Sequence, residues 1–156
     1  MKKGKLFIAA LLLAISFNSY AQMPAHLTES KLIAVVNTAD WCRVCKENGA
    51  RFGAVLTPYA SNGVNIYLND LSNNSTKVAS QEVLEKAGVY KATTTIPRKG
   101  MGKMLKACGI VKDKKQKADV AGVVTFINAK THKQVKQVSI SIPDAEMQEI
   151  ITNLLK

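Results

Sequence analysis

Residues 31–60 read KLIAVVNTADWCRVCKENGARFGAVLTPYA, and this stretch decides the fold of the chain. It begins with five apolar residues at 32–36, a run that is typical of a strand buried on both faces. After Cys42, apolar residues recur at helical spacing, at positions 44/45, 52, 55/56 and 59. The stretch therefore predicts a buried strand that leads into an amphipathic helix, with Cys42 at the junction.

Two cysteines, Cys42 and Cys45, stand at the start of this predicted helix. Unpaired N–H groups and the helix dipole favour negative charge there, so the Cys42 thiol should ionise more easily than a free thiol. Cys45 follows three residues later, on the same face of the helix and within disulfide reach. Arg43 and Lys46 place cations beside both sulfurs, which should favour the thiolate further.

The segment 39–46, ADWCRVCK, resembles the W-C-x-x-C-K active-site segment of the thioredoxin superfamily. A bare CxxC is a weak signal because zinc sites also use it, but a strand, Trp41, CxxC, Lys46 and a helix together are more specific. The resemblance implies an α/β, thioredoxin-like fold with a central mixed β-sheet flanked by helices. It covers about residues 31–92 and 118–156, and only the WCxxC segment is specific.

The resemblance also implies thiol–disulfide oxidoreductase activity. Cys42 would be the nucleophile and Cys45 the resolving thiol of a redox-active disulfide that exchanges with protein substrates. A second protein would recycle the couple, and we expect no cofactor and no nucleic-acid partner. The expected neighbours of the two sulfurs are Asp40, Trp41, Arg43, Val44, Lys46 and Ala121.

The sequence departs from the family's pattern on the side opposite the cysteines. The family carries a cis-proline before the strand of the final hairpin, and this position is Ala121 here. A non-proline cis bond costs about 3–4 kcal/mol, so we expect a trans bond or an altered loop. Pro97 could supply the proline if the chain were threaded differently. The absence of the proline at position 121 should affect substrate recognition more than disulfide chemistry.

Two further departures lie closer to the cysteines. Many thioredoxins hold a buried acid six residues before the first cysteine, where this chain has Val36, so proton transfer to Cys45 would need water or another group such as Asp40. The usual Gly-Pro between the cysteines is replaced by Arg43 and Val44. A cation there should favour the dithiol, which predicts a more oxidising couple than the roughly −270 mV of thioredoxin.

Residues 1–21 have the pattern of a signal peptide, which leaves residues 22–156 as one thioredoxin-like domain. Three lysines precede twelve mainly apolar residues, 6–17, and small side chains stand at positions 19 and 21. Twelve residues are too few to span a bilayer, although an uncleaved anchor is the alternative. We therefore expect export, to the periplasm of a Gram-negative host or otherwise by secretion, where disulfides persist.

Basic residues outnumber acidic ones by 22 to 11, and a cluster of them lies late in the chain. We interpret residues 93–117, approximately, as a basic insertion with a short helix, placed before the final β-hairpin. It is either a solvated charged face or a docking surface for an acidic partner or an anionic membrane. Its basic residues are Arg98, Lys99, Lys103, Lys106, Lys112, Lys114, Lys115 and Lys117.

The remaining elements are predicted from local patterns. Residues 64–68 alternate as a strand does, with Asp70 in the loop that follows, and a helix over about 76–88 would be capped by Ser75 or Thr76. Residues 122–128 and 134–140 predict a hairpin. A terminal helix should follow Pro143. Its inward positions would be Ala145, Met147, Ile150, Ile151 and Leu154.

Cys108 is the third cysteine, and we expect a buried, inert thiol there because free cysteine behaves as a small apolar residue. It could instead be a resolving thiol or a metal ligand. Cys42 and Cys45, with or without Cys108, could hold Cu(I) or Zn(II), so metal handling is an alternative function. A third possibility is a redox-inactive binding module that keeps the fold and a static disulfide.

Overall fold

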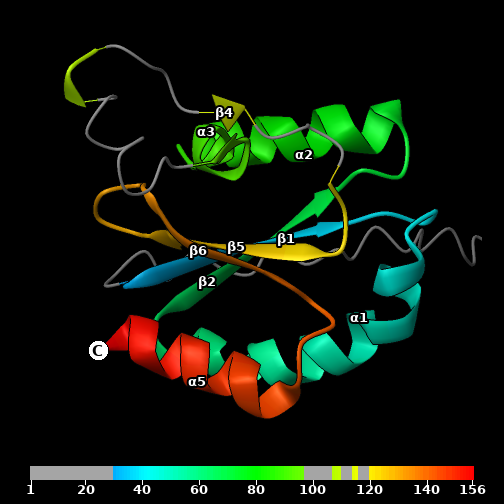
Figure 1. The fold of residues 1–156 in the computed structure, drawn as a ribbon. Helices are drawn as coiled ribbons and strands as arrows, with labels where there is room; N and C mark the ends of the chain where they lie inside the picture. Colours follow the sequence, from blue (N-terminus) through cyan, green and yellow to red (C-terminus); the bar gives the residue numbers. More distant parts are fainter. Residues whose placement is uncertain (1–29, 97–106, 110–113, 116–119) are drawn as a thin grey trace, which may run out of the picture.

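The computed structural model describes residues 30–96, 107–109, 114–115 and 120–156 (Figure 1). The central sheet contains four strands in the order β2-β1-β5-β6. They are β1 (Leu32–Thr38), β2 (Val64–Asp70), β5 (Val123–Asn128) and β6 (Gln134–Ser139). β1 and β2 are parallel, whereas β5 is antiparallel to both β1 and β6. The sheet is therefore mixed, with β1 in its interior as the apolar run at 32–36 predicts.

Helices cover both faces of this sheet (Figure 1). α1 (Arg43–Leu56), which continues into the 3-10 helix η1 (Thr57–Asn62), lies on one face together with α5 (Asp144–Leu155). α2 (Asn74–Lys86) and the short α3 (Tyr90–Thr93) lie on the other. This architecture confirms the predicted α/β class, a thioredoxin-like fold with a central mixed sheet flanked by helices.

The core has two parts, one on each side of the sheet. Alternate residues of β1 belong to one part or the other, because successive side chains of a strand point to opposite faces of the sheet. Leu32, Ala34 and Val36 join the larger cluster, which contains Phe52 of α1 and Met147 of α5. The smaller cluster, under α2 and α3, contains Ile33, Val35, Leu84, Val89 and Ile127.

Two predicted boundaries between 64 and 88 are wrong. β2 extends to Asp70, which was expected in a loop, because β2 pairs with β1 along its whole length. α2 begins at Asn74, and its cap is Asn73 rather than Ser75 or Thr76. The Asn73 side chain accepts the N–H groups of Ser75 and Thr76, and the Thr76 hydroxyl accepts the N–H of Asn73, which completes a capping box.

The end of the chain follows the prediction with one exception. β5 and β6 form the predicted hairpin, and α5 begins directly after Pro143. Met147 and Ile151 are buried, and Ile150 and Leu154 are partly buried against the core. Ala145, which was expected to face inward, is exposed, because it lies off the stripe that these four residues form on α5.

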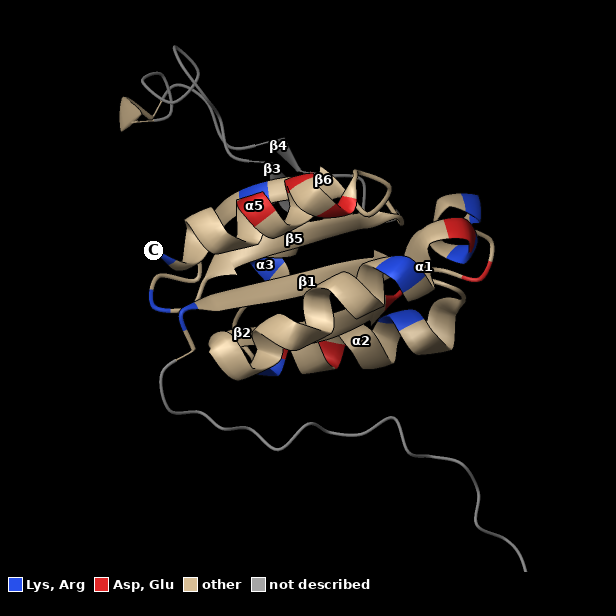
Figure 2. Ribbon diagram, turned by 90° about the horizontal axis from the view of Figure 1, so that it is seen from below, with Lys and Arg blue, Asp and Glu red and all other residues tan. Residues whose placement is uncertain are grey.

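The predicted signal peptide, residues 1–21, and most of the basic insertion, including its predicted helix, lie outside the described residues. Two short strands of the insertion, β3 (Thr95–Ile96) and β4 (Lys114–Lys115), pair antiparallel with each other. None of the described helices is long and apolar enough to cross a membrane. Figure 2 shows both basic and acidic residues on α1 and α2, whereas the charged residues of α5 are all acidic.

Candidate active site

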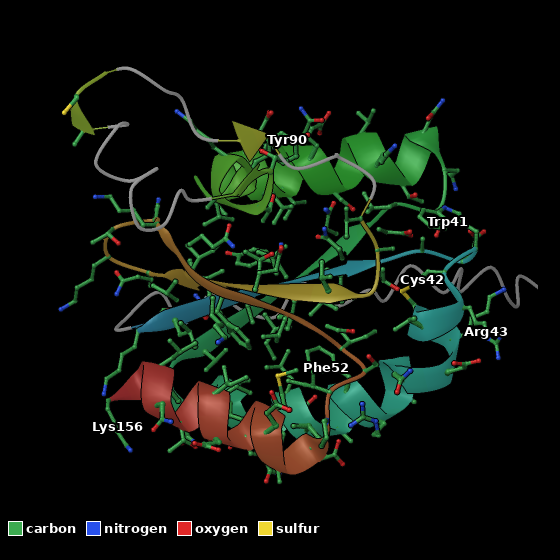
Figure 3. All side chains as sticks on the ribbon, viewed as in Figure 1. Trp41, Cys42, Arg43, Phe52, Tyr90 and Lys156 are labelled. Atoms are coloured by element: carbon green, nitrogen blue, oxygen red, sulfur yellow. A yellow bond between two sulfur atoms is a disulfide. The ribbon has the colours of Figure 1, made fainter. Side chains whose placement is uncertain are left out.

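A disulfide joins Cys42 to Cys45 at the start of α1 (Figure 3). The two Cα atoms lie 5.2 Å apart, within the range that disulfides need, so the predicted disulfide reach is confirmed. Cys42 is the N-cap residue of α1, with an extended backbone, and its Sγ accepts the N–H of Cys45 at 3.1 Å. The Cys42 sulfur therefore lies at the end of the helix where free N–H groups and the dipole favour negative charge.

Cys42 is more buried than a nucleophile that attacks protein disulfides needs to be. It retains 7% of its surface, the same fraction as Cys45. The cause is the chain just before β5, which packs on the sulfur: a Cβ atom placed on Gly122 would lie 3.4 Å from Cys42 Sγ. Little of the surface of Cys42 is therefore open to an approaching group.

Gly122 is a residue of the site that the sequence analysis missed. Its φ of +78° is in the left-handed region, which favours glycine. Its N–H donates to the Asn37 carbonyl at 2.8 Å, and its carbonyl accepts the N–H of Ile140 at 3.0 Å. A side chain at this position would also meet Val44 Cγ1 at 3.3 Å. Glycine thus lets the backbone approach the disulfide closely.

Ala121, at the position of the family's cis-proline, is partly buried and packs against the core cluster that contains both cysteines. None of the described residues has a cis peptide bond, so the expected trans bond at Ala121 is confirmed. Pro97, the alternative source of the proline, lies outside the described residues. The residue that approaches the sulfur here is the following one, Gly122.

The cations beside the disulfide are directed to solvent. The Arg43 side chain is 89% exposed, and its Nε lies 2.6 Å from Glu47 Oε1, one turn further along α1. Lys46 is exposed, and so is Val44, which was expected on the buried side of the helix. The i,i+4 spacing of Arg43 and Glu47 could have indicated this ion pair from the sequence. Because Glu47 pairs with Arg43 and both side chains are exposed, Arg43 should favour a thiolate on Cys42 less than the sequence predicts.

Trp41 and Asp40 belong to the loop that precedes the disulfide. Trp41 is 55% exposed, and its Nε1 donates to the Leu71 carbonyl at 3.2 Å, which fixes the ring beside Cys42 (Figure 3). Asp40 is exposed, and its N–H donates to Ser72 Oγ at 2.9 Å. Both bonds tie this loop to the residues that follow β2. The loop therefore presents a fixed aromatic surface next to the sulfurs.

The remaining predicted groups lie apart from this arrangement. Val36, at the position of the family's buried acid, packs in the same apolar cluster as Cys45. Cys108 is exposed and unpaired, which contradicts the expected buried thiol. It lies in a turn before Gly109, whose φ is +74°, and all three described residues 107–109 are exposed. In the described ranges, no three His, Cys, Asp or Glu side chains form a group that could hold a metal.

Comparison with known proteins gives structural neighbours only. No family model matches the chain. No curated protein matches it either. A thiol:disulfide interchange protein of the thioredoxin family from Chlorobium tepidum has a TM-score of 0.46 and 15% identity, over 82% of this chain and 82% of that one. StoA from Bacillus subtilis has a TM-score of 0.41 and 17% identity, over 78% of this chain and 82% of that one. The dsbF protein of MTB has a TM-score of 0.41 and 19% identity, over 81% of this chain and 82% of that one.

Proposed function

We propose that this chain is an exported thiol–disulfide oxidoreductase that acts on protein substrates, with Cys42 as nucleophile and Cys45 as resolving thiol. The observation that carries the proposal is the position of Cys42 Sγ, at the N-cap of α1 and 3.1 Å from the Cys45 nitrogen. After reduction, the same helix N-terminus would stabilise a negative charge on this sulfur. A thiolate is the form of cysteine that attacks disulfides.

The exchange balances two electrons between protein and substrate. In the reducing direction, the Cys42 thiolate attacks one sulfur of a substrate disulfide, that bond breaks, and the second substrate sulfur leaves as a thiolate. The Cys45 thiol then loses its proton and attacks Cys42 Sγ, which re-forms the Cys42–Cys45 bond and releases the first substrate sulfur. The substrate gains two electrons and two protons, of which one is the proton that Cys45 loses and the other comes from solvent. The reverse sequence donates the disulfide to a substrate dithiol.

The surface around the disulfide supports a protein substrate. Trp41 and Val44, which precede and follow Cys42 closely in the chain, are 55% and 38% exposed, whereas Cys42 retains only 7% of its surface. An apolar segment that docks on these two side chains would bring its own sulfur to Cys42. Aromatic residues are enriched in protein interfaces because they combine a large apolar area with little conformational freedom.

Export and recycling complete the proposal. The pattern of residues 1–21 supports export, to the periplasm of a Gram-negative host or otherwise outside the cell. A redox partner there would return the couple to its working state. Because the helix N-terminus favours the thiolate, we expect a reduction potential above the roughly −270 mV of thioredoxin.

The test is to trap the mixed disulfide. The reduced Cys45→Ser variant should accumulate adducts with a protein substrate whose disulfides are intact, such as insulin. These adducts should disappear from a non-reducing gel when Cys42→Ser is introduced as well. Cys108→Ser, introduced into every variant, removes the exposed third thiol. If no adduct forms through Cys42, and the unmodified protein does not reduce insulin with dithiothreitol present, the proposal is wrong.

A further inference from the structure

A pocket of about 230 Å³ lies on the face of the sheet that α2 and α3 cover, opposite the face that carries α1. Asn37 of β1 and Asn69 of β2 line it, and these two residues are register partners near the carboxyl ends of the parallel strands. In open α/β sheets, ligands bind in crevices at the carboxyl ends of the strands. The position of the pocket therefore agrees with a binding site.

The wall that α2 gives to this pocket is mainly polar, although it faces the sheet. A helix that packs on a sheet usually turns an apolar stripe inward. α2 instead lines the pocket with three polar residues, Asn74, Lys77 and Gln81, and one apolar residue, Val78, and among the residues of α2 only Leu84 is buried. Meanwhile Val83 of the same helix is 50% exposed. Apolar packing does not explain this distribution, whereas a polar ligand between helix and sheet does.

The hydrogen bonds of the two asparagines leave one acceptor without a partner. The Val120 carbonyl can only accept, so the Asn37 atom 2.9 Å from it is the donor Nδ2. Asn37 Oδ1 then accepts from Asn69 Nδ2 at 2.9 Å. Consequently Asn69 keeps its Oδ1 free, and no described residue donates to it. Asn69 is only 6% exposed, and leaving such a buried polar group unsatisfied costs about 1–3 kcal/mol.

We infer that this pocket binds a small, neutral molecule or side chain that carries a carboxamide or hydroxyl group, which donates a hydrogen bond to Asn69 Oδ1. A carboxylate offers only acceptors and cannot satisfy this atom. Carboxamides and hydroxyls both donate and accept, which suits the amides of α2 and the Thr93 and Thr94 residues that also line the pocket. Its volume corresponds to about seven or eight water molecules at about 30 Å³ each.

The same residues connect the pocket to the disulfide. Asn37 binds Val120 through its side chain and Gly122 through its backbone carbonyl, and Gly122 lies against Cys42. On the other side, Leu71 lines the pocket and accepts the Trp41 Nε1–H. A ligand on Asn69 is thus two hydrogen-bonded steps from the loop that touches the sulfur. Binding itself does not depend on the proposed redox function.

The test compares two probes of the same shape, acetamide and acetate, on the isotope-labelled full chain. In NMR titrations, acetamide should shift the side-chain NH₂ signals of Asn37 and Asn69 saturably, with an affinity at least tenfold above that of acetate. Glycerol serves as the hydroxyl-bearing probe and shows which of the two donor groups the pocket prefers. Equal or stronger binding of acetate, or no saturable shift with either acetamide or glycerol, would overturn the inference.

Two matched variants locate the binding. Val78 and Val83 are both exposed on α2, but only Val78 lines the pocket. Val78→Phe should therefore weaken acetamide binding at least fivefold, whereas Val83→Phe should leave it unchanged. Asn69→Leu should abolish binding, and Asn65→Leu on the same strand should not. If the Val78 and Val83 variants bind acetamide equally, the pocket is not the site.

Discussion

Replacing Gly122 with alanine tests the close approach of the backbone to the disulfide. At φ +78°, an L-residue costs about 1–2 kcal/mol more than glycine. The added Cβ would also lie 3.3 Å from Val44 Cγ1 and 3.4 Å from Cys42 Sγ, so its neighbours would have to move by a few tenths of an ångström. We therefore expect the oxidised protein to lose about 1.5–3 kcal/mol of its free energy of unfolding.

Urea unfolding followed by circular dichroism measures this loss. Gly53→Ala is the matched control, because Gly53 lies within α1 and a Cβ there meets nothing within 4 Å. This control should gain about 0.5–1 kcal/mol, since alanine is the better helix former. Val44→Ala combined with Gly122→Ala should recover the part of the loss that comes from the contact with Val44. A loss below about 0.5 kcal/mol for Gly122→Ala would refute the left-handed, closely packed backbone at this position.

Three other perturbations test separate parts of the structure. In reduced single-cysteine variants at neutral pH, iodoacetamide should alkylate the buried Cys42 faster than the exposed Cys108. An equal or slower rate at Cys42 would contradict stabilisation of its thiolate by the helix. Glu47→Gln removes the partner of Arg43 and leaves its cation free to favour the thiolate. The reduction potential, measured against a glutathione buffer, should therefore rise, by less than about 20 mV for such an exposed pair. A fall in the potential would contradict this reasoning. Arg51→Met should cost about 1–3 kcal/mol in urea unfolding, because Arg51 Nη2 donates to the carbonyls of Ile140 and Ile142, whereas Arg43→Met should change stability by less than about 0.5 kcal/mol.

Local signals in the sequence predict the elements that depend on neighbouring residues. The strand at 32–36, the helix after Cys42 and the hairpin near the end each follow from a continuous pattern, and the structure contains all three. The cap of α2 is harder to predict, because Asn73, Ser75 and Thr76 are all good capping residues. The choice depends on the backbone, since of the three only Asn73 has the extended conformation that a cap needs.

Features that depend on distant residues could not be predicted in the same way. Gly122 covers Cys42 although 80 positions separate them, so the burial of the sulfur depends on how the sheet places the chain before β5. Asn37 and Asn69 meet only because β1 and β2 pair in a particular register. A polar residue that interrupts the apolar alternation Ile33, Val35, Asn37 was the available signal, and it indicates a buried amide without identifying its partner.

The recessed position of Cys42 has a kinetic consequence for the proposed exchange. An attacking sulfur must reach a residue that retains 7% of its surface, next to an indole ring held by a hydrogen bond and to the chain at Gly122. A disulfide in a flexible or unfolded segment can extend to this residue, but one held flat within a rigid domain cannot. Such a site would select substrate proteins by their conformation, and turnover would be faster on nascent or misfolded chains than on folded ones.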